Sequence, residues 1–232
     1  MNIYKKNLNR LKQNLVYNET MEHDACGVGL VASTEGVKSR KVVEYGIQAL
    51  KAVWHRGAID ADGKTGDGAG IHIEIPKDFF IEKIEITGHR HDDSDLCVGM
   101  IFLPRNDYQG QEQCRIIVES ELTKKNFNIY GWRQVPVNPS VLGEKAENTR
   151  PEITQVLFKH NDKKVIGKNL ERVLYETRRK IEKEALNNQL NGFYICSFSS
   201  KSIIYKGMFL AEALSDFYTD LKDERFISRF AI

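Results

Sequence analysis

Long apolar stretches, blocks of one charge and closely spaced cysteine pairs are all missing from this chain of 232 residues. The longest apolar run extends only from Cys97 to Leu103, too short to cross a bilayer, so we expect no membrane partner. Acidic and basic residues are interspersed and the net charge is +2, so we expect no nucleic-acid partner. Without internal repeats, the chain is expected to be one globular unit or part of one.

The four cysteines are too far apart in the sequence to indicate a zinc ribbon or a redox dithiol. No secretory apolar segment occurs near the N-terminus, and we therefore expect reduced thiols in a cytoplasmic protein. The first 20 residues are basic and rich in asparagine. An organelle presequence is the less favoured alternative for this stretch, and we expect residues 1–25 to be a removable leader.

Hydrophobic periodicity predicts an α+β protein. Helices are expected over residues 40–54, 77–84, 110–125, 170–190 and 211–221. Ser39 is expected to cap the first of them, and the apolar face of the fourth is expected to hold Leu170, Val173, Leu174, Thr177 and Ile181. Strands are expected over residues 27–33, 71–75, 96–103, 128–137, 153–158, 193–198 and 202–205, the last two forming a hairpin. Because several strands follow one another with few crossover helices, the pattern favours antiparallel sheets over a doubly wound parallel sheet.

Cys26 is the most informative cysteine, because Gly27 and Gly29 follow it and lead into an apolar run. Only a few per cent of a free thiol is thiolate at neutral pH, so a nucleophilic cysteine needs a base. An α-amino group on the same residue, with a pKa of about 7.7–8.0, could act as that base. This hypothesis requires cleavage between Ala25 and Cys26. The alternative is that Cys26 is a small buried apolar residue.

Two polar segments follow the first predicted helix. His55, Arg56 and Gly57 fit the basic end and glycine cap of a helix, and alternatively Arg56 helps to shape a pocket around Cys26. The glycine-rich segment 65–70 fits a turn that enters a strand. No Gly-Lys-Ser/Thr follows it, so nucleotide binding is not expected.

The remaining histidines do not form a ligand cluster in the sequence. His72 is expected to point outward from a strand, and His160 to end one. His89 and His91 lie near the acidic residues 92, 93 and 95, for which we expect a solvated loop rather than a divalent-ion site. The sequence therefore predicts no metal site.

Taken together, these motifs resemble the class II glutamine amidotransferase domain found at the start of glutamate synthase large chains. The resemblance covers essentially the whole chain from about Tyr17 onward, and its order and spacing make it specific. The segments that carry it are residues 22–29, 48–50, 55–58, 65–71, 131–137, 151–156, 193–195 and 204–208.

The resemblance implies both a fold and a reaction. The fold is the four-layer αββα sandwich of N-terminal nucleophile hydrolases. Cys26 would become the N-terminus and attack the side-chain amide of L-glutamine, giving a γ-glutamyl thioester and ammonia, which aminates 2-oxoglutarate in a separate synthase domain. Arg56 and Gly57 would belong to the glutamine pocket. No cofactor is implied here; FMN and an iron–sulfur cluster would belong to other domains, with a small electron-transfer subunit or ferredoxin as a further partner.

Two segments expected from the resemblance do not occur before Ile232. One carries the arginine that holds the glutamine carboxylate, and the other the Asn-Gly that forms the oxyanion hole. Loss of one oxyanion donor costs about 10²–10³ in rate, so we expect residues 26–232 to be a partial domain with little activity alone. The alternatives are a thiol hydrolase that uses Cys26 with His55, and a non-catalytic binding module.

Overall fold

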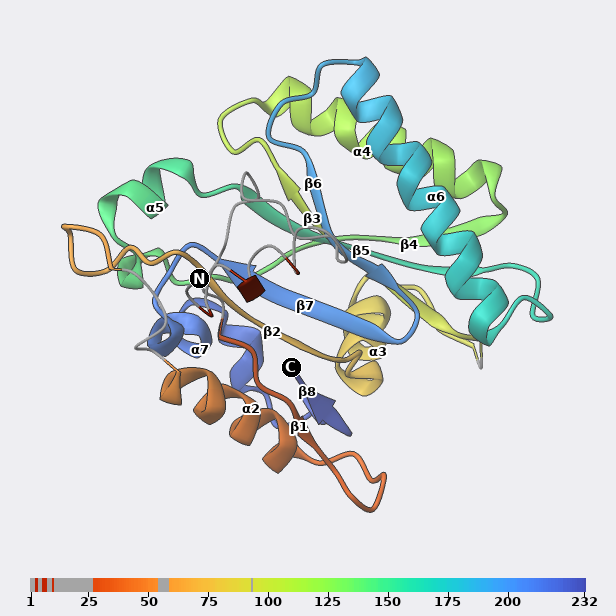
Figure 1. Ribbon diagram of the computed structural model, residues 1–232. Coiled ribbons are helices and arrows are strands. Elements are labelled where there is room, and N and C mark those ends of the chain that lie inside the picture. The colour runs from red at the N-terminus through yellow and green to blue at the C-terminus, as the bar shows by residue number, and fades with distance from the viewer. Residues whose placement is uncertain (1–2, 4–5, 8–9, 11–26, 54–58, 93) are drawn as a thin grey trace.

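The computed structural model describes residues 3, 6–7, 10, 27–53, 59–92 and 94–232 (Figure 1). Three residues singled out by the sequence, Cys26, Arg56 and Gly57, lie outside the described residues, and so does His55. The structure therefore bears on the surroundings of the expected site and not on these side chains.

The described residues form two antiparallel sheets of four strands each (Figure 1). In spatial order, the first sheet contains β1 (Val31–Ala32), β8 (Phe230–Ala231), β2 (Ala69–Glu74) and β7 (Ser202–Gly207). The second contains β4 (Phe127–Gln134), β5 (Glu152–His160), β3 (Leu96–Leu103) and β6 (Tyr194–Ser199). The predicted α+β class with antiparallel sheets is confirmed.

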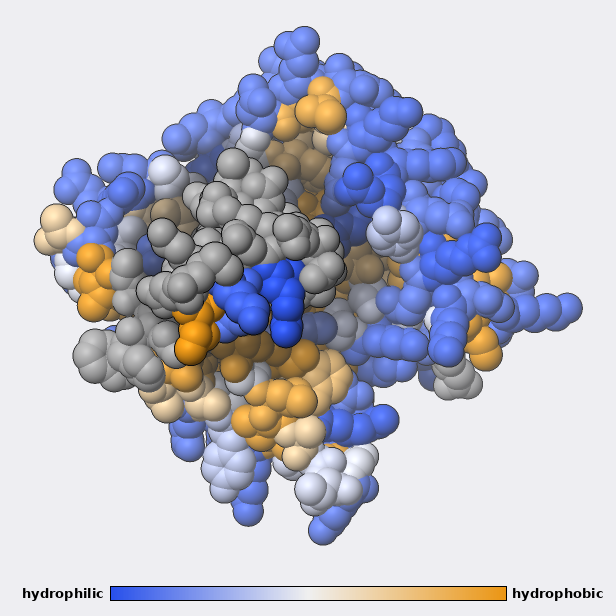
Figure 2. Space-filling view, viewed as in Figure 1, coloured by the Kyte–Doolittle hydropathy of each residue, from blue (hydrophilic) through white to orange (hydrophobic). Residues whose placement is uncertain are grey.

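Helices cover parts of both sheets. The α-helices are α2 (Arg40–Ala52), α3 (Lys77–Ile86), α4 (Tyr108–Lys124), α5 (Glu144–Thr149), α6 (Gly167–Asn187) and α7 (Leu214–Phe217). Short 3₁₀ helices are η2 (Pro139–Val141), η3 (Ala211–Ala213) and η4 (Thr219–Lys222). Helices α4 and α6 lie side by side against the second sheet, and α2 packs on the first (Figure 1). Figure 2 shows a mostly hydrophilic surface over α4 and α6, and hydrophobic residues gathered near β1 and β8.

Strand β3 is buried on both faces, and its side chains alternate between two cores. Val98 and Met100 join the larger core, which also holds Ile71 of β2. Cys97 and Ile101 join the smaller core together with apolar residues of α4 and α6. A strand covered on both faces needs no polar side chain, which explains its continuous apolar sequence.

Ser39 caps α2 as the sequence predicts, since its hydroxyl accepts a hydrogen bond from the N–H of Val42 at 3.4 Å. The predicted strand over 27–33 is too long. The strand β1 contains only Val31 and Ala32, which pair with Ala231 and Phe230 respectively. The Ser33 N–H donates one further bond in this register, to the Arg229 carbonyl at 2.7 Å.

The predicted hairpin of β6 and β7 is wrong in its pairing, because these strands belong to different sheets. A bulge at Cys196 interrupts the register of β6 against β3. Side chains of β6 then bind the backbone of Ile204 on β7: the Ser197 hydroxyl accepts from its N–H at 3.2 Å, and the Cys196 thiol donates to its carbonyl at 3.5 Å. The chain thus passes from one sheet to the other.

The predicted helix over 211–221 is also wrong as a single element. It is divided into η3, α7 and η4, and Tyr218 lies between the last two with an extended backbone (φ −92°, ψ 94°). This conformation lets the buried Tyr218 hydroxyl donate a hydrogen bond to the carbonyl of Lys206 at 2.8 Å.

Candidate active site

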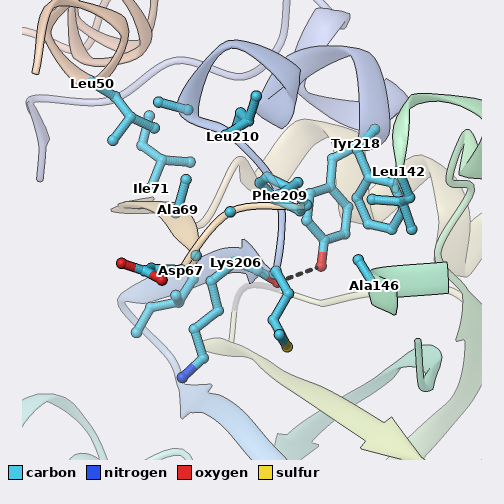
Figure 3. Close-up of a pocket in the computed structure, with 18 of the residues that line it drawn as sticks. Leu50, Asp67, Ala69, Ile71, Leu142, Ala146, Lys206, Phe209, Leu210 and Tyr218 are labelled. Atoms are coloured by element: carbon cyan, nitrogen blue, oxygen red, sulfur yellow. Dashed lines mark hydrogen bonds between the residues drawn. The ribbon is translucent and has the colours of Figure 1, made fainter. Parts of the chain in front are cut away.

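A pocket of about 1000 Å³ lies beside β2 and β7 (Figure 3). Gly27, the residue that follows Cys26 in the chain, lines it. Residues 66–72 and 206–212 form much of its wall, and further lining residues come from α2, α5 and the second sheet. The pocket therefore includes the first described residue after the predicted nucleophile.

One side of the pocket is apolar. Figure 3 shows Leu142 and Ala146 near Phe209 and Tyr218, and the hydrogen bond from the Tyr218 hydroxyl to Lys206. Burial raises the pKa of Tyr218, so this hydroxyl stays a neutral donor at physiological pH. The bond fixes the segment after β7 against the pocket wall.

Charged residues lie on other parts of the wall. Asp67 and Lys206 are on neighbouring segments (Figure 3). The Lys206 ammonium donates to the Tyr194 hydroxyl at 2.7 Å and lies 4.5 Å from the centre of its ring. His72 also lines the pocket, and partial burial lowers its pKa. A ligand here would meet both charge signs beside an apolar wall, which suits a zwitterionic amino acid.

The glycine-rich segment that enters β2 brings two strands unusually close. A Cβ atom at Gly70 would lie 2.7 Å from the Cβ of Lys206 and 2.8 Å from the carbonyl oxygen of Tyr205. Gly68 has a φ of +127°, which side-chain-bearing residues rarely adopt. The sequence-based expectation of a glycine turn feeding a strand is confirmed, and the close approach of β7 gives its physical reason.

The loop before that segment is held by its own polar side chains. The Asp62 carboxylate accepts hydrogen bonds from the Thr65 hydroxyl at 2.6 Å and from the N–H groups of Thr65 and Lys64 at 2.7 and 2.9 Å. These bonds, that of the Thr65 hydroxyl foremost, lower the pKa of Asp62 to about 2. Asp60 is joined to Lys145 of α5 at 2.8 Å. The loop thereby positions the start of the glycine-rich segment.

Three of the four cysteines are buried and are poor nucleophiles. Cys97, Cys114 and Cys196 are free thiols with at most 4% of their surface exposed. Burial raises the pKa of Cys97, and raises the pKa of Cys114 and of Cys196 to about 11. Since the thiolate is the nucleophile, none of these three is suited to attack a substrate.

The structure also bears on the predicted histidine-rich loop. His91 Nδ1 lies 2.9 Å from the Tyr130 hydroxyl, and Asp92 forms an ion pair with Lys159 at 2.9 Å. Among the residues that the structure describes, no group of three or more His, Cys, Asp or Glu could hold a metal ion. His160 ends β5, as the sequence predicts.

Several pocket residues were not identified as site residues from the sequence. Lys206 belongs to a segment that carries the family resemblance, and Tyr194 and Tyr218 lie in a predicted strand and a predicted helix. The sequence signal that could have identified Lys206 is the segment 204–208, in which Lys-Gly-Met follows a predicted strand. The glycine-rich segment 65–70, in turn, precedes a predicted strand. Sequence alone does not show that these two segments meet.

Comparison with known proteins decides the family. The sequence profile of class-II glutamine amidotransferases matches residues 26–232, which is most of the chain. The chain belongs to this family. The matched region begins at Cys26 itself.

Individual relatives of this family are glutamate synthases. The chain is 58% identical over 216 residues to the glutamate synthase (NADPH) large chain of Azospirillum brasilense. It is 39% identical over 212 residues to ferredoxin-dependent glutamate synthase 2 of Synechocystis sp., and 38% identical over 213 residues to the chloroplastic ferredoxin-dependent enzyme of Spinacia oleracea. These matches cover 91–93% of this chain but only 13–14% of the relatives. The chain thus spans about one seventh of their length.

None of the helices in the described part of the chain has the length and apolar character needed to cross a membrane.

Proposed function

We propose that this chain is the glutaminase part of a glutamate synthase, with Cys26 as its nucleophile. The family match that begins at Cys26 supports this role, and so does the position of Gly27 on the pocket wall. The burial of Cys97, Cys114 and Cys196 leaves Cys26 as the cysteine suited to attack. The family match is the observation that carries the proposal.

The proposed reaction has two steps. The Cys26 thiolate adds to the side-chain carbonyl carbon of L-glutamine, and the α-amino group takes the thiol proton and passes it to the leaving nitrogen. Ammonia departs and a γ-glutamyl thioester remains. Water then attacks the thioester carbon, releases L-glutamate and restores the thiol. The α-amino group is free only if residues 1–25 are removed as a leader, which is part of the proposal.

We further propose that Arg56 and Gly57 help to form the glutamine pocket, and that residues 26–232 belong to a four-layer αββα sandwich. The two antiparallel sheets and the helices packed against each of them support that fold. Each half would offer an apolar sheet face to the other and an outer face to helices.

The wider enzyme is proposed from the relatives. Ammonia would aminate 2-oxoglutarate in a synthase domain of the same protein, where FMN and an iron–sulfur cluster would supply the electron-transfer chemistry. The chain is more similar to the relative named for NADPH than to the ferredoxin-dependent relatives. This difference favours a nicotinamide nucleotide over ferredoxin as the electron donor, with a small electron-transfer subunit as the partner. A cytoplasmic location fits the free thiols Cys97, Cys114 and Cys196.

The proposal is tested by glutamate release from glutamine in the complete enzyme that contains this chain. Cys26→Ser is expected to lower turnover by at least about 10³-fold. His55→Gln is expected to leave most of it, because the α-amino group is the base. Mass analysis should find Cys26 at the mature N-terminus. Full activity with Met1 retained, or with Cys26→Ser, would refute the proposal.

A further inference from the structure

A second cavity of about 310 Å³ adjoins the pocket and is bounded by two arginines. Phe102, Arg150 and Tyr194 line both cavities, and Arg105 lines only the second. Arg105 follows β3 in the chain and Arg150 follows α5, so two separate segments bring these guanidinium groups together.

The two arginines share a single carboxylate. Arg105 Nη1 lies 2.7 Å from Glu147 Oε1, and Arg150 Nε lies 2.8 Å from Glu147 Oε2. The bond from Arg150, above all, lowers the pKa of Glu147, so this group is ionised at neutral pH. Two positive charges therefore face one negative charge, which leaves the cluster with a surplus of one positive charge.

Donor groups of the cluster also remain available. Within the described part of the chain, no hydrogen-bond partner is recorded for Nε and Nη2 of Arg105 or for Nη1 of Arg150. The nearby carbonyls of Pro104 and Arg105, which would repel an anion, accept hydrogen bonds from the Gln111 amide at 2.9 and 3.2 Å. The cavity thus has free N–H donors and a net positive charge.

We propose that this second cavity binds a small carboxylate anion between Arg105 and Arg150. The planar guanidinium fork matches the two oxygens of a carboxylate, and one negative charge balances the surplus. If the proposed function holds, two carboxylates have access: L-glutamate formed in the adjoining pocket, and 2-oxoglutarate from the synthase reaction. Carboxylate binding itself does not depend on glutaminase activity.

Isothermal titration of the purified 232-residue chain tests the proposal. Acetate, L-glutamate and 2-oxoglutarate are titrated at constant ionic strength in chloride buffer, with sulfate as a control anion. We expect saturable binding of the carboxylates with a Kd below about 10 mM, and weaker binding of sulfate. Tighter binding of L-glutamate would identify a product site, and tighter binding of 2-oxoglutarate a site for the synthase substrate. Absence of saturation, or equal binding of sulfate, would overturn the proposal.

Variants locate the site. Arg105→Gln should weaken carboxylate binding about tenfold or more, since it removes a charged donor. Glu147→Gln should strengthen binding, because it adds one unit of net positive charge; a purely structural cluster would not show this gain. Arg172→Gln, at an 80% exposed side chain of α6, is the matched control and should change nothing.

Unchanged affinity in both Arg105→Gln and Glu147→Gln would refute the site. If Arg105→Gln fails to fold, Arg105→Lys keeps the charge but not the fork and should still bind more weakly. An inactive parent enzyme with intact carboxylate binding would refute the proposed function and leave this inference standing.

Discussion

The guanidinium of Arg133 and the carboxylate of Asp220 form a two-point ion pair, with Nη1–Oδ2 and Nη2–Oδ1 distances of 2.8 and 2.6 Å. The pair joins β4 to η4, although its members lie far apart in the sequence. Gln155 accepts a further bond from Arg133 at 2.7 Å, and the Tyr205 hydroxyl donates to Asp220 at 3.2 Å. This buried network ties the second sheet to β7 and to the segment that leads to β8.

Replacement of Asp220 by alanine should destabilise the fold strongly. Asp220 is 5% exposed, and its loss leaves the mostly buried Arg133 charge without its partner. We expect the free energy of unfolding in urea to fall by about 3 kcal/mol or more. Asp216→Ala removes an exposed partner of Lys222 in the same region and should cost no more than about 1 kcal/mol. Equal losses of unfolding free energy in the two variants would show that the buried network does not stabilise the fold more than an exposed ion pair.

Gly70→Ala should destabilise the chain through steric overlap. The new methyl group would lie 2.7 Å from the Lys206 Cβ, where two backbones limit any adjustment. An overpacked site of this kind costs about 1–3 kcal/mol, which chemical denaturation can resolve. Gly29→Ala is the matched control, because a Cβ there meets nothing within 4 Å among the described residues. If Gly70→Ala and Gly29→Ala have the same free energy of unfolding, β2 and β7 do not approach as closely at Gly70 as described here.

The loop before the glycine-rich segment should give a defined acid dependence. The folded-state pKa of Asp62 is lowered to about 2 from its ordinary 3.8. Its stabilising contribution is therefore fully present above about pH 4 and is lost as the pH falls toward about 2. The difference in the urea midpoint of unfolding between the native chain and Asp62→Asn should therefore become smaller as the pH falls from about 4 to about 2. A pH-independent difference between the native chain and Asp62→Asn would contradict the mechanism.

Thiol labelling should separate the cysteines by burial. Cys97, Cys114 and Cys196 are buried, and their raised pKa values keep them as thiols at pH 8. We expect iodoacetamide to modify them in the native chain far more slowly than in urea, as followed by peptide mass spectrometry. Under the proposed function, Cys26 is labelled first. Rapid native modification of Cys196 would show that the contact between β6 and β7 opens readily.

Local sequence patterns predicted several elements closely. The apolar run from Cys97 to Leu103 lies within β3, and the Ser39 cap begins α2. The helical spacing of Leu170, Leu174 and Ile181 identified the buried face of α6. These predictions succeed because periodicity and capping depend on near neighbours in the chain. The ordered motifs likewise indicated the family, which the comparison then confirmed.

The predictions that failed depend on tertiary contacts that local periodicity does not contain. The tight turn after β6 is typical of a hairpin, but a bulge at Cys196 and side-chain bonds to Ile204 send β7 into the other sheet. The predicted helix over 211–221 is interrupted because Tyr218 bonds to Lys206. The bonds to Ile204 join residues 7 and 8 positions apart, and the bond to Lys206 joins residues 12 positions apart. Helix and strand periodicity, which relates nearer neighbours, does not contain these contacts.

The α+β class, most element positions and the family can be predicted from the sequence alone, because they follow from local periodicity and from the order of motifs along the chain. The pairing of the strands and the burial of the cysteines become known from the folded structure. The same holds for the ion pair of Arg133 with Asp220 and for the cluster of Arg105 and Arg150 around Glu147. The physical reason is that burial and electrostatic coupling are set by distance in space, which folding makes short for residues far apart in the sequence.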